Sequence, residues 1–269
     1  MKTPVIVTGA AGKMGRRITA AVVRDSRLEL QGATEAPQHP ELGTDAGVLA
    51  GTGAAGINLT DKLESLITDQ SVVIDFTYHQ ASVAHVKACE QQGSAMVIGT
   101  TGFSEEEKKV IEDAALKISV VLAPNMSLGV NLLFHLIGET ARILGDDFDV
   151  EIVEAHHRQK KDAPSGTALR LAEIAAAAKG WSPQDTVQYC RQGDIGARPL
   201  KEIGVQSVRG GDIVGEHTVT FAGQGERIEI CHRAHSRDTF AGGAARAALW
   251  VAGREPGLYS MQDVLGIGT

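Results

Sequence analysis

The sequence predicts an α/β fold with two domains, and three patterns along its 269 residues carry this prediction. A strand-like apolar run at residues 4–8 leads into a glycine-rich turn and then an amphipathic helix. Strand-like and helix-like segments alternate up to residue 122, as in the βαβ units of a parallel sheet. Longer strands with period-two alternation follow in the second half. We therefore expect a Rossmann-type parallel-sheet domain, followed by an α+β domain with a mixed, largely antiparallel sheet.

The turn after the first strand, at residues 9–15, has the pattern G-x-x-G-x-x-G, a variant of the dinucleotide-binding fingerprint. In this fingerprint the glycines form a tight turn, let the backbone approach a pyrophosphate and let the helix pack on the sheet. A second strand, at residues 28–34, is followed by Glu35, where an acidic residue binds the ribose hydroxyls of a nicotinamide dinucleotide. The turn alone could be an ordinary strand-to-helix connection. The strand, helix and acid together predict a dinucleotide site.

Further strands and helices complete the predicted first domain. The helix at residues 104–117 begins with a capping box, in which Ser104 is the N-cap and Glu107 follows three residues later. The glycine-rich stretch at residues 43–56 predicts an irregular connection. The other expected segments are strands at 72–76, 95–98 and 119–122, a helix at 80–91 and a short strand-like run at 57–59.

The second half of the chain begins with one long apolar helix, at residues 127–144. Longer strands follow it, and in the strand at residues 213–222 His217 and Phe221 share one face. The other strands of this half are expected at 148–155, 203–208 and 227–234.

The change of pattern near residue 126 sets the expected domain boundary. We predict a first domain at residues 1–126 and a second at residues 127–238. A last amphipathic helix lies within residues 239–269, and we expect this stretch to return to the first domain.

The segment at residues 154–168 carries the strongest chemical signal. His156, His157 and Lys160 lie shortly before Pro164-Ser-Gly-Thr167, after which a helix-forming stretch begins. A helix N-terminus binds anions through its free N–H groups and its dipole. Imidazole and ammonium groups beside it can neutralise carboxylates and donate protons. The segment could be a solvated surface loop, but its composition favours a site for an acidic small molecule that receives a proton.

Composition limits the class of protein further. The net charge of −7 argues against a nucleic-acid surface and against an anionic membrane as partner. Three widely spaced cysteines without a C-x-x-C pair predict free thiols in a reducing compartment. The chain contains no apolar stretch of transmembrane length, and its start lacks the apolar region of a signal peptide. We therefore expect a cytoplasmic protein.

We expect no metal site. The histidine pair at 232 and 235 lacks the further ligands that a metal ion would need.

Five blocks of the sequence closely resemble the 4-hydroxy-tetrahydrodipicolinate reductase family, formerly called dihydrodipicolinate reductases, of the diaminopimelate route to lysine. The blocks are residues 9–15, 74–77, 97–103, 154–168 and 210–217. The resemblance covers essentially the whole chain. It implies a Rossmann domain, a substrate domain whose sheet builds a homotetramer, and hydride transfer from NADH or NADPH to a small cyclic dicarboxylate.

The resemblance also implies roles for the matched residues. His156 and Lys160 match the catalytic proton-donor pair, in which we assign the general acid to Lys160 and an assisting or relay role to His156. The matched substrate-binding residues are His157, Ser165, Gly166 and Thr167. The matched cofactor-binding residues are Gly9, Ala10, Ala11, Gly12, Lys13, Met14, Glu35, Gly99, Thr100, Thr101, Ala123, Pro124, Asn125 and Met126.

One position departs from the family pattern. Members that use NADPH well often have an arginine directly after the ribose acid, whereas this chain has Ala36. Glu35 would repel a 2′-phosphate, and Lys13 and Arg16 would compensate only in part. We therefore expect NADH to be used at least as well as NADPH.

Two other functions compete with this interpretation. The first is another nicotinamide-dependent reductase of small imino or amino acids, and the residues from His156 to Thr167 argue against it. The second is a dinucleotide-sensing module without catalysis, and the presence of both His156 and Lys160 argues against that.

Overall fold

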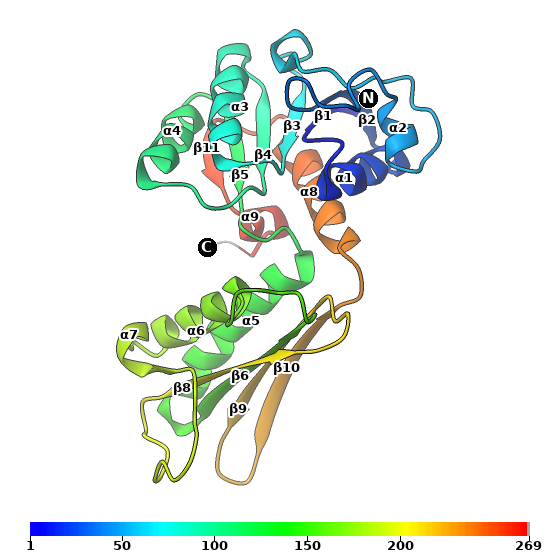
Figure 1. Cartoon of the computed structure of the whole chain (residues 1–269). Helices are drawn as coiled ribbons and strands as arrows, with labels where there is room; N and C mark the ends of the chain where they lie inside the picture. Colours follow the sequence, from blue (N-terminus) through cyan, green and yellow to red (C-terminus); the bar gives the residue numbers. More distant parts are fainter. Residues whose placement is uncertain (268–269) are drawn as a thin grey trace. The chain divides into compact units, whose positions relative to one another are not determined.

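The computed structural model describes residues 1–267, which divide into two compact units (Figure 1). Unit 1 combines Met1–Leu128 with the chain from Arg237 onward, and unit 2 is Gly129–Ser236. The end of the chain thus belongs to the same unit as the N-terminal half.

Unit 1 is built on a six-stranded sheet of order β11-β5-β4-β3-β1-β2, in which all neighbouring strands are parallel. The strands are β1 (Thr3–Thr8), β2 (Leu28–Thr34), β3 (Val72–Asp75), β4 (Ala95–Ile98), β5 (Ser119–Leu122) and β11 (Gly257–Tyr259). The strand order reverses at β1, so a crevice opens beyond the carboxyl ends of β1 and β3, where such sheets bind ligands. This sheet confirms the predicted Rossmann-type fold class.

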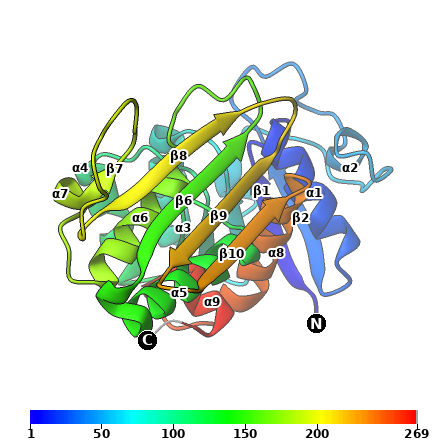
Figure 2. The ribbon, with the colours of Figure 1, turned by 90° about the horizontal axis from the view of Figure 1, so that it is seen from below.

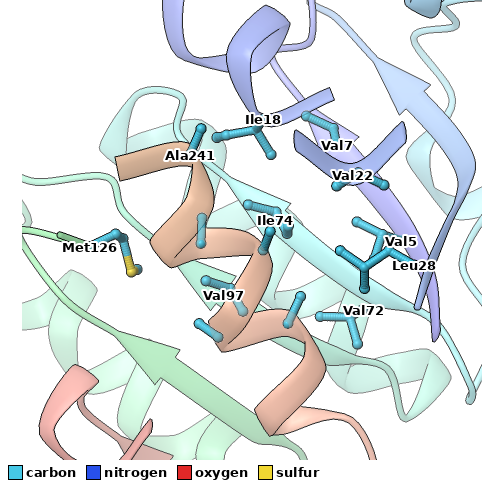
Figure 3. Close-up of a cluster of buried hydrophobic side chains, with 14 of the residues drawn as sticks. Val5, Val7, Ile18, Val22, Leu28, Val72, Ile74, Val97, Met126 and Ala241 are labelled. Carbon is cyan, nitrogen blue, oxygen red and sulfur yellow. The ribbon is translucent and has the colours of Figure 1, made fainter. Parts of the chain in front are cut away.

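Helices cover both faces of this sheet, because alternate side chains of each strand point to opposite sides. The helices of unit 1 are α1 (Lys13–Arg24), α2 (Ala46–Leu49), α3 (His79–Gln92), α4 (Glu105–Ala115), α8 (Asp238–Val251) and α9 (Met261–Leu265), with a 3₁₀ turn at Leu63–Ser65. Val5 and Val7 pack in one apolar cluster with residues of α1 and α8 (Figure 3). Ile6 packs in another cluster, with residues of α3 and α4. The predicted capping box at Ser104 and Glu107 is confirmed.

Unit 2 contains a mixed five-stranded sheet of order β10-β9-β6-β8-β7, whose longer strands are seen side by side in Figure 2. The strands are β6 (Asp149–His156), β7 (Val187–Gln188), β8 (Ile203–Arg209), β9 (Gly215–Ala222) and β10 (Arg227–Ala234). The pairs β6–β9 and β9–β10 are antiparallel, whereas β6–β8 and β7–β8 are parallel. The mixed sheet was predicted, and the parallel pair β6–β8 arises because a helical connection separates these strands.

One face of this second sheet carries the core of unit 2. Ile152, Val219 and Phe221 are fully buried there against the helices α5 (Leu128–Leu144) and α6 (Gly166–Ala178). The same face of β9 holds His217, as its period-two pattern predicts. The opposite face exposes apolar side chains, among them Val153 at 42% and Val208 at 48%. Unit 2 also contains the short helix α7 (Pro183–Thr186) and a 3₁₀ turn at Gly145–Asp147.

None of the helices within residues 1–267 has the length and apolarity needed to span a bilayer.

Candidate active site

The glycine-rich turn of unit 1 needs its glycines for steric reasons. Gly9 has a φ of +62°, and a Cβ added there would lie 2.8 Å from the Thr77 side chain. A Cβ added at Gly15 would lie 2.0 Å from the Gly9 carbonyl oxygen, so the first turn of α1 packs directly on the turn. The backbone is therefore as close to the sheet as the dinucleotide fingerprint requires.

Glu35 is tied to this turn by its carboxylate. The Ala11 amide donates to Oε2 at 3.0 Å, and the Ala36 amide donates to Oε1 at 3.0 Å. Glu35 also lines a pocket of about 380 Å³ together with Gly9, Gly12 and Ala36. A carboxylate beside the glycine-rich turn could accept hydrogen bonds from the ribose hydroxyls of a dinucleotide.

A second pocket of unit 1, of about 400 Å³, gathers residues from distant parts of the chain. It is lined by Lys13, Met14, Phe76, Pro124, Asn125, Met126, Arg237 and Phe240. Phe76 lines both pockets, and a Cβ at Gly99 would lie 2.2 Å from its ring, so the ring rests on this glycine. Gly99 and Thr100 thus lie behind Phe76, the residue that lines both pockets. Thr101 is exposed. Ala10 and Ala123 are buried, so only their backbone could meet a ligand.

The predicted catalytic residues belong to unit 2, and β6 positions the first of them. Glu154 and His156 lie two residues apart on this strand, so their side chains share a face. His156 Nδ1 is 2.6 Å from Glu154 Oε2, and Glu154 is fully buried. Because a carboxylate only accepts hydrogen bonds, Nδ1 carries the proton and Nε2 is the nitrogen left for chemistry.

Arg209 holds Glu154 from the neighbouring strand. It is the residue paired with His156 in the β6–β8 register, and its guanidinium donates to both Glu154 oxygens at 2.8 and 2.7 Å. The Ser165 amide donates to Glu154 Oε1 at 3.1 Å. The buried carboxylate is therefore fully paired, which is the condition for keeping a charge inside a protein.

These contacts set the protonation states of the pair. Burial by itself would raise the pKa of Glu154, but hydrogen bonds from Arg209 and His156 outweigh it and lower this pKa to about 2. Burial lowers the pKa of His156 below its usual range, against the opposing effect of Glu154. At neutral pH the site therefore combines a carboxylate with a largely neutral imidazole, and His156 Nε2 is a proton acceptor.

Lys160 supplies a cation in the loop that follows β6. Its Nζ is 2.8 Å from Asp162 Oδ2, and its backbone amide donates to the His157 carbonyl at 3.0 Å. Its positive charge is one of the causes that lower the pKa of His156. Lys160 thus lies in the loop that directly follows His156, the last residue of β6.

The N-terminus of α6 lies beside this pair. Ser165 is its N-cap, and its Oγ accepts from the Ala168 amide at 3.2 Å. Since the Ser165 amide is committed to Glu154, the open part of this helix end is at Gly166, where an added Cβ would have no neighbour within 4 Å among the described atoms. His157 is half-buried, and its Nδ1 has no hydrogen-bond partner in the part of the chain described.

His217, from β9, completes the wall of the site. Its Nε2 is 3.1 Å from Ser165 Oγ, and its ring meets that of His156 edge to face at 5.3 Å. Burial, followed by the charge of His156, lowers the pKa of His217 to about 4. His217 is therefore neutral at physiological pH.

The lowered pKa of His217 predicts a pH-dependent stability. Its folded pKa of about 4 lies below the ordinary 6.5, so the folded state binds the proton less readily than the unfolded state. The neutral His217 therefore contributes on the order of 3 kcal/mol to the free energy of unfolding above pH 6.5, and this contribution is lost as the pH falls towards 4. We expect His217→Gln to lose less stability than the wild type between pH 7.5 and 4.5 in urea unfolding. His235→Gln, at an exposed histidine, should leave the wild-type slope unchanged; equal slopes for all three proteins would contradict the prediction.

Two site residues escaped the sequence analysis. Arg209 could not be assigned to the site from the sequence, because its contact with Glu154 spans 55 positions. Gly215 was not considered, yet a Cβ there would lie 3.0 Å from His156 Nε2, so the glycine makes room for the imidazole. His217 carried a signal through its sequence block, but the block did not reveal its contact with Ser165.

A dinucleotide-type fold in unit 1, together with a carboxylate–histidine pair, a lysine and a helix N-terminus in unit 2, is typical of nicotinamide-dependent oxidoreductases. Comparisons with known proteins give the family. Residues 3–126 match the family model "Dihydrodipicolinate reductase, N-terminus", and residues 129–265 match "Dihydrodipicolinate reductase, C-terminus". The chain therefore belongs to the dihydrodipicolinate reductase family.

Individual relatives agree with this assignment. The chain is 54% identical to the 4-hydroxy-tetrahydrodipicolinate reductase of Anaeromyxobacter dehalogenans, with 98% of each chain covered. It is 52% identical to that of Citrifermentans bemidjiense, again with 98% of each chain covered. Among solved structures it resembles dipicolinate-bound dihydrodipicolinate reductase from Paenisporosarcina sp. TG-14, with a TM-score of 0.77, 26% identity, and 98% and 99% of the two chains covered.

Proposed function

We propose that this protein reduces 4-hydroxy-tetrahydrodipicolinate to tetrahydrodipicolinate with a hydride from NADH or NADPH and a proton, with loss of the 4-hydroxyl group as water, in the biosynthesis of diaminopimelate and lysine. The observation that carries the proposal is the group formed by Glu154, His156, Lys160 and the N-terminus of α6, in a chain at least 52% identical to reductases of this name. A dinucleotide sensor without catalysis would not need a buried carboxylate to orient a histidine beside a lysine. An amino-acid dehydrogenase is not favoured by the family assignment.

The residues of unit 1 fit a nicotinamide dinucleotide. The turn at Gly9–Met14 would face the pyrophosphate, and Glu35 would accept the ribose hydroxyls beside it. The pocket lined by Lys13, Met14 and residues 124–126 would hold the nicotinamide end, backed by Gly99 and Thr100. When bound, the reduced nicotinamide supplies the hydride.

The residues of unit 2 would bind the substrate and supply the proton. One carboxylate would lie at Gly166 and Thr167, where the dipole of α6 is positive, with His157 and Ser165 beside it. Negative charge develops on the ring as it is reduced, and the Lys160 ammonium would stabilise this charge and then donate its proton. His156, with Nδ1–H held by Glu154 and Nε2 unprotonated, would relay protons.

The direct test is the initial rate of cofactor oxidation. The substrate would be formed in place by the preceding synthase from pyruvate and aspartate semialdehyde, with NADH and NADPH run in parallel. Turnover with either cofactor is the expected result. A folded protein that binds NADH without turnover would refute the proposed activity.

Cofactor choice is a prediction of its own. The Glu35 carboxylate accepts hydrogen bonds from the Ala11 and Ala36 amides, which hold it in place. It would therefore repel a 2′-phosphate, and Ala36 provides no cation to offset this repulsion. Arg16 is close, since its Nε donates to the Ala11 carbonyl at 2.8 Å, but its guanidinium also lies 3.7 Å from Glu41. We expect kcat/KM for NADH to equal or exceed that for NADPH, and Ala36→Arg to raise the NADPH value about tenfold, the gain from roughly 1.4 kcal/mol of added attraction. Ala36→Gln is the neutral control; a strong NADPH preference in the unaltered protein would contradict the prediction.

Surface properties support the proposed assembly and location. The uncovered face of the second sheet, with Val153 and Val208 exposed at 42% and 48%, would form the subunit contact of a homotetramer. Cys89, Cys190 and Cys231 are free thiols, which suits the reducing cytoplasm. Sedimentation equilibrium tests the assembly, and a monomer at micromolar concentration would refute it.

A further inference from the structure

Unit 1 contains a buried carboxylate that the proposed mechanism does not use. Asp75 is the last residue of β3, at the carboxyl edge of the sheet, and is fully buried. Its Oδ1 accepts hydrogen bonds from the Thr77 amide at 3.0 Å and from the hydroxyls of Thr77, Ser82 and Thr100 at 2.8, 2.7 and 2.8 Å. Its Oδ2 lies 2.5 Å from His85 Nδ1. One carboxylate therefore ties together the loops after β3 and β4 and the first turns of α3.

These ties shape the pocket beside Glu35. Thr77 and His85 both line this pocket of about 380 Å³, and the Thr77 amide also donates to Thr100 Oγ1 at 2.9 Å. Burial would raise the pKa of Asp75, but hydrogen bonds led by that of His85 lower it to about 2. Because the carboxylate stays ionised, His85 must keep its Nδ1 proton directed at Asp75.

The distal nitrogen of His85 is the one available to a ligand. Among the described residues, His85 forms its hydrogen bonds through Nδ1, and its side chain remains 22% exposed in the pocket wall. Because Nδ1 is directed at Asp75, Nε2 is the ring nitrogen that remains for a hydrogen bond with a ligand.

The rest of the pocket suits a planar heterocycle. Its apolar lining consists of Ala36, Pro37, Leu63, Phe76 and Tyr78. Tyr78 lines the pocket and is 61% exposed, so its ring is available as a stacking surface for a base. Apolar walls with a few placed polar groups are typical of sites that bind aromatic ligands.

We propose that Asp75 and His85 form a base-reading pair, in which Asp75 fixes the tautomer of His85 and His85 Nε2 accepts a hydrogen bond from the exocyclic amino group of adenine. The inference rests on the proposed dinucleotide site and assigns its nucleobase specificity to these residues. Asp75 is then a positioning residue, and His85 is the contact. A hypoxanthine base would place a carbonyl oxygen opposite Nε2, so acceptor would face acceptor.

The test compares binding of NADH with binding of its hypoxanthine analogue, reduced nicotinamide hypoxanthine dinucleotide, by fluorescence titration. We expect the unaltered protein to bind NADH about tenfold more tightly, the value of one hydrogen bond at roughly 1.4 kcal/mol. In His85→Asn, which keeps a donor for Asp75 and lacks the distal nitrogen, the ratio should fall to about one. A purely structural role would weaken both dinucleotides alike and leave the ratio unchanged.

A matched control lies on the same helix. His79 pairs with Glu107 at 2.7 Å through the same nitrogen, but it is not among the residues that line the pocket. His79→Asn should retain the tenfold ratio. An unchanged ratio in His85→Asn, or no preference in the unaltered protein, would overturn the pair's role while NADH binding still supports the cofactor site. Failure of both dinucleotides to bind would overturn the cofactor site and this inference with it.

Discussion

Replacing Lys160 with alanine is expected to lower kcat by about 10²- to 10⁴-fold, the usual contribution of a positioned general acid. His156 cannot readily take over, because its Nδ1 proton is held by Glu154 at 2.6 Å and its lowered pKa leaves Nε2 unprotonated at neutral pH. The ammonium also stabilises the charge that develops on the reduced ring, so both effects are lost together. Steady-state rates with saturating NADH measure the loss, and NADH titration should give an unchanged Kd.

Lys161 provides the control, since it is the adjacent lysine in the same loop and is exposed. Lys161→Ala removes the same charge from the loop and should retain kcat within about twofold, because the exposed Lys161 side chain has no role in the proposed proton transfer. A Lys160→Ala enzyme with near wild-type turnover would show that the acid is another group. A matching loss in Lys161→Ala would show that the loop needs charge in general rather than an acid at one position.

The local parts of the fold could be predicted because short-range rules determine them. Apolar periodicity predicts the first strand and α1. The turn at residues 9–15 could be predicted because its glycines occupy positions where a side chain would clash. The cap at Ser104 needs only a neighbour three positions away. The three-residue strand β11 escaped detection because its edge position in the sheet depends on β5, more than a hundred positions earlier in the chain.

The candidate site divides in the same way. His156, Lys160 and Ser165 lie within ten positions, so their proximity could be inferred from the sequence. Arg209 and His217 reach the site only because β8 and β9 pair with β6 on either side, and the register of those pairs is a tertiary property. The contact between Asp75 and His85 could not be predicted, although only ten positions separate them. It depends on where α3 lies relative to the carboxyl edge of β3, which is a tertiary property.

Replacing Arg209 with methionine is expected to destabilise the protein by about 3–5 kcal/mol, because it leaves the Glu154 carboxylate buried without its cation. Arg209 provides two of the hydrogen bonds that lower the pKa of Glu154 to about 2. This lowered pKa contributes stability above the ordinary carboxyl pKa of 4.5, and the contribution is lost as the pH falls towards 2. Without Arg209 the pKa of Glu154 should rise. The variant should therefore lose most stability, relative to the wild type, at neutral pH, where Glu154 is ionised. Urea unfolding at pH 7 and pH 4 measures both effects.

A second substitution separates the buried charge from the lost side chain. Arg209→Met combined with Glu154→Gln removes the unpaired charge while keeping an amide that can meet His156 and Ser165, so it should recover much of the stability. Arg233→Met breaks an ion pair of similar chemistry with Glu216, but both side chains are more than a third exposed, so it should cost less than about 1 kcal/mol. If Arg209→Met costs no more than Arg233→Met, the Glu154 site is hydrated and Glu154 does not need Arg209. If the double variant is stable but turnover remains low, the carboxylate is needed for the orientation and polarity of His156 beyond its part in folding.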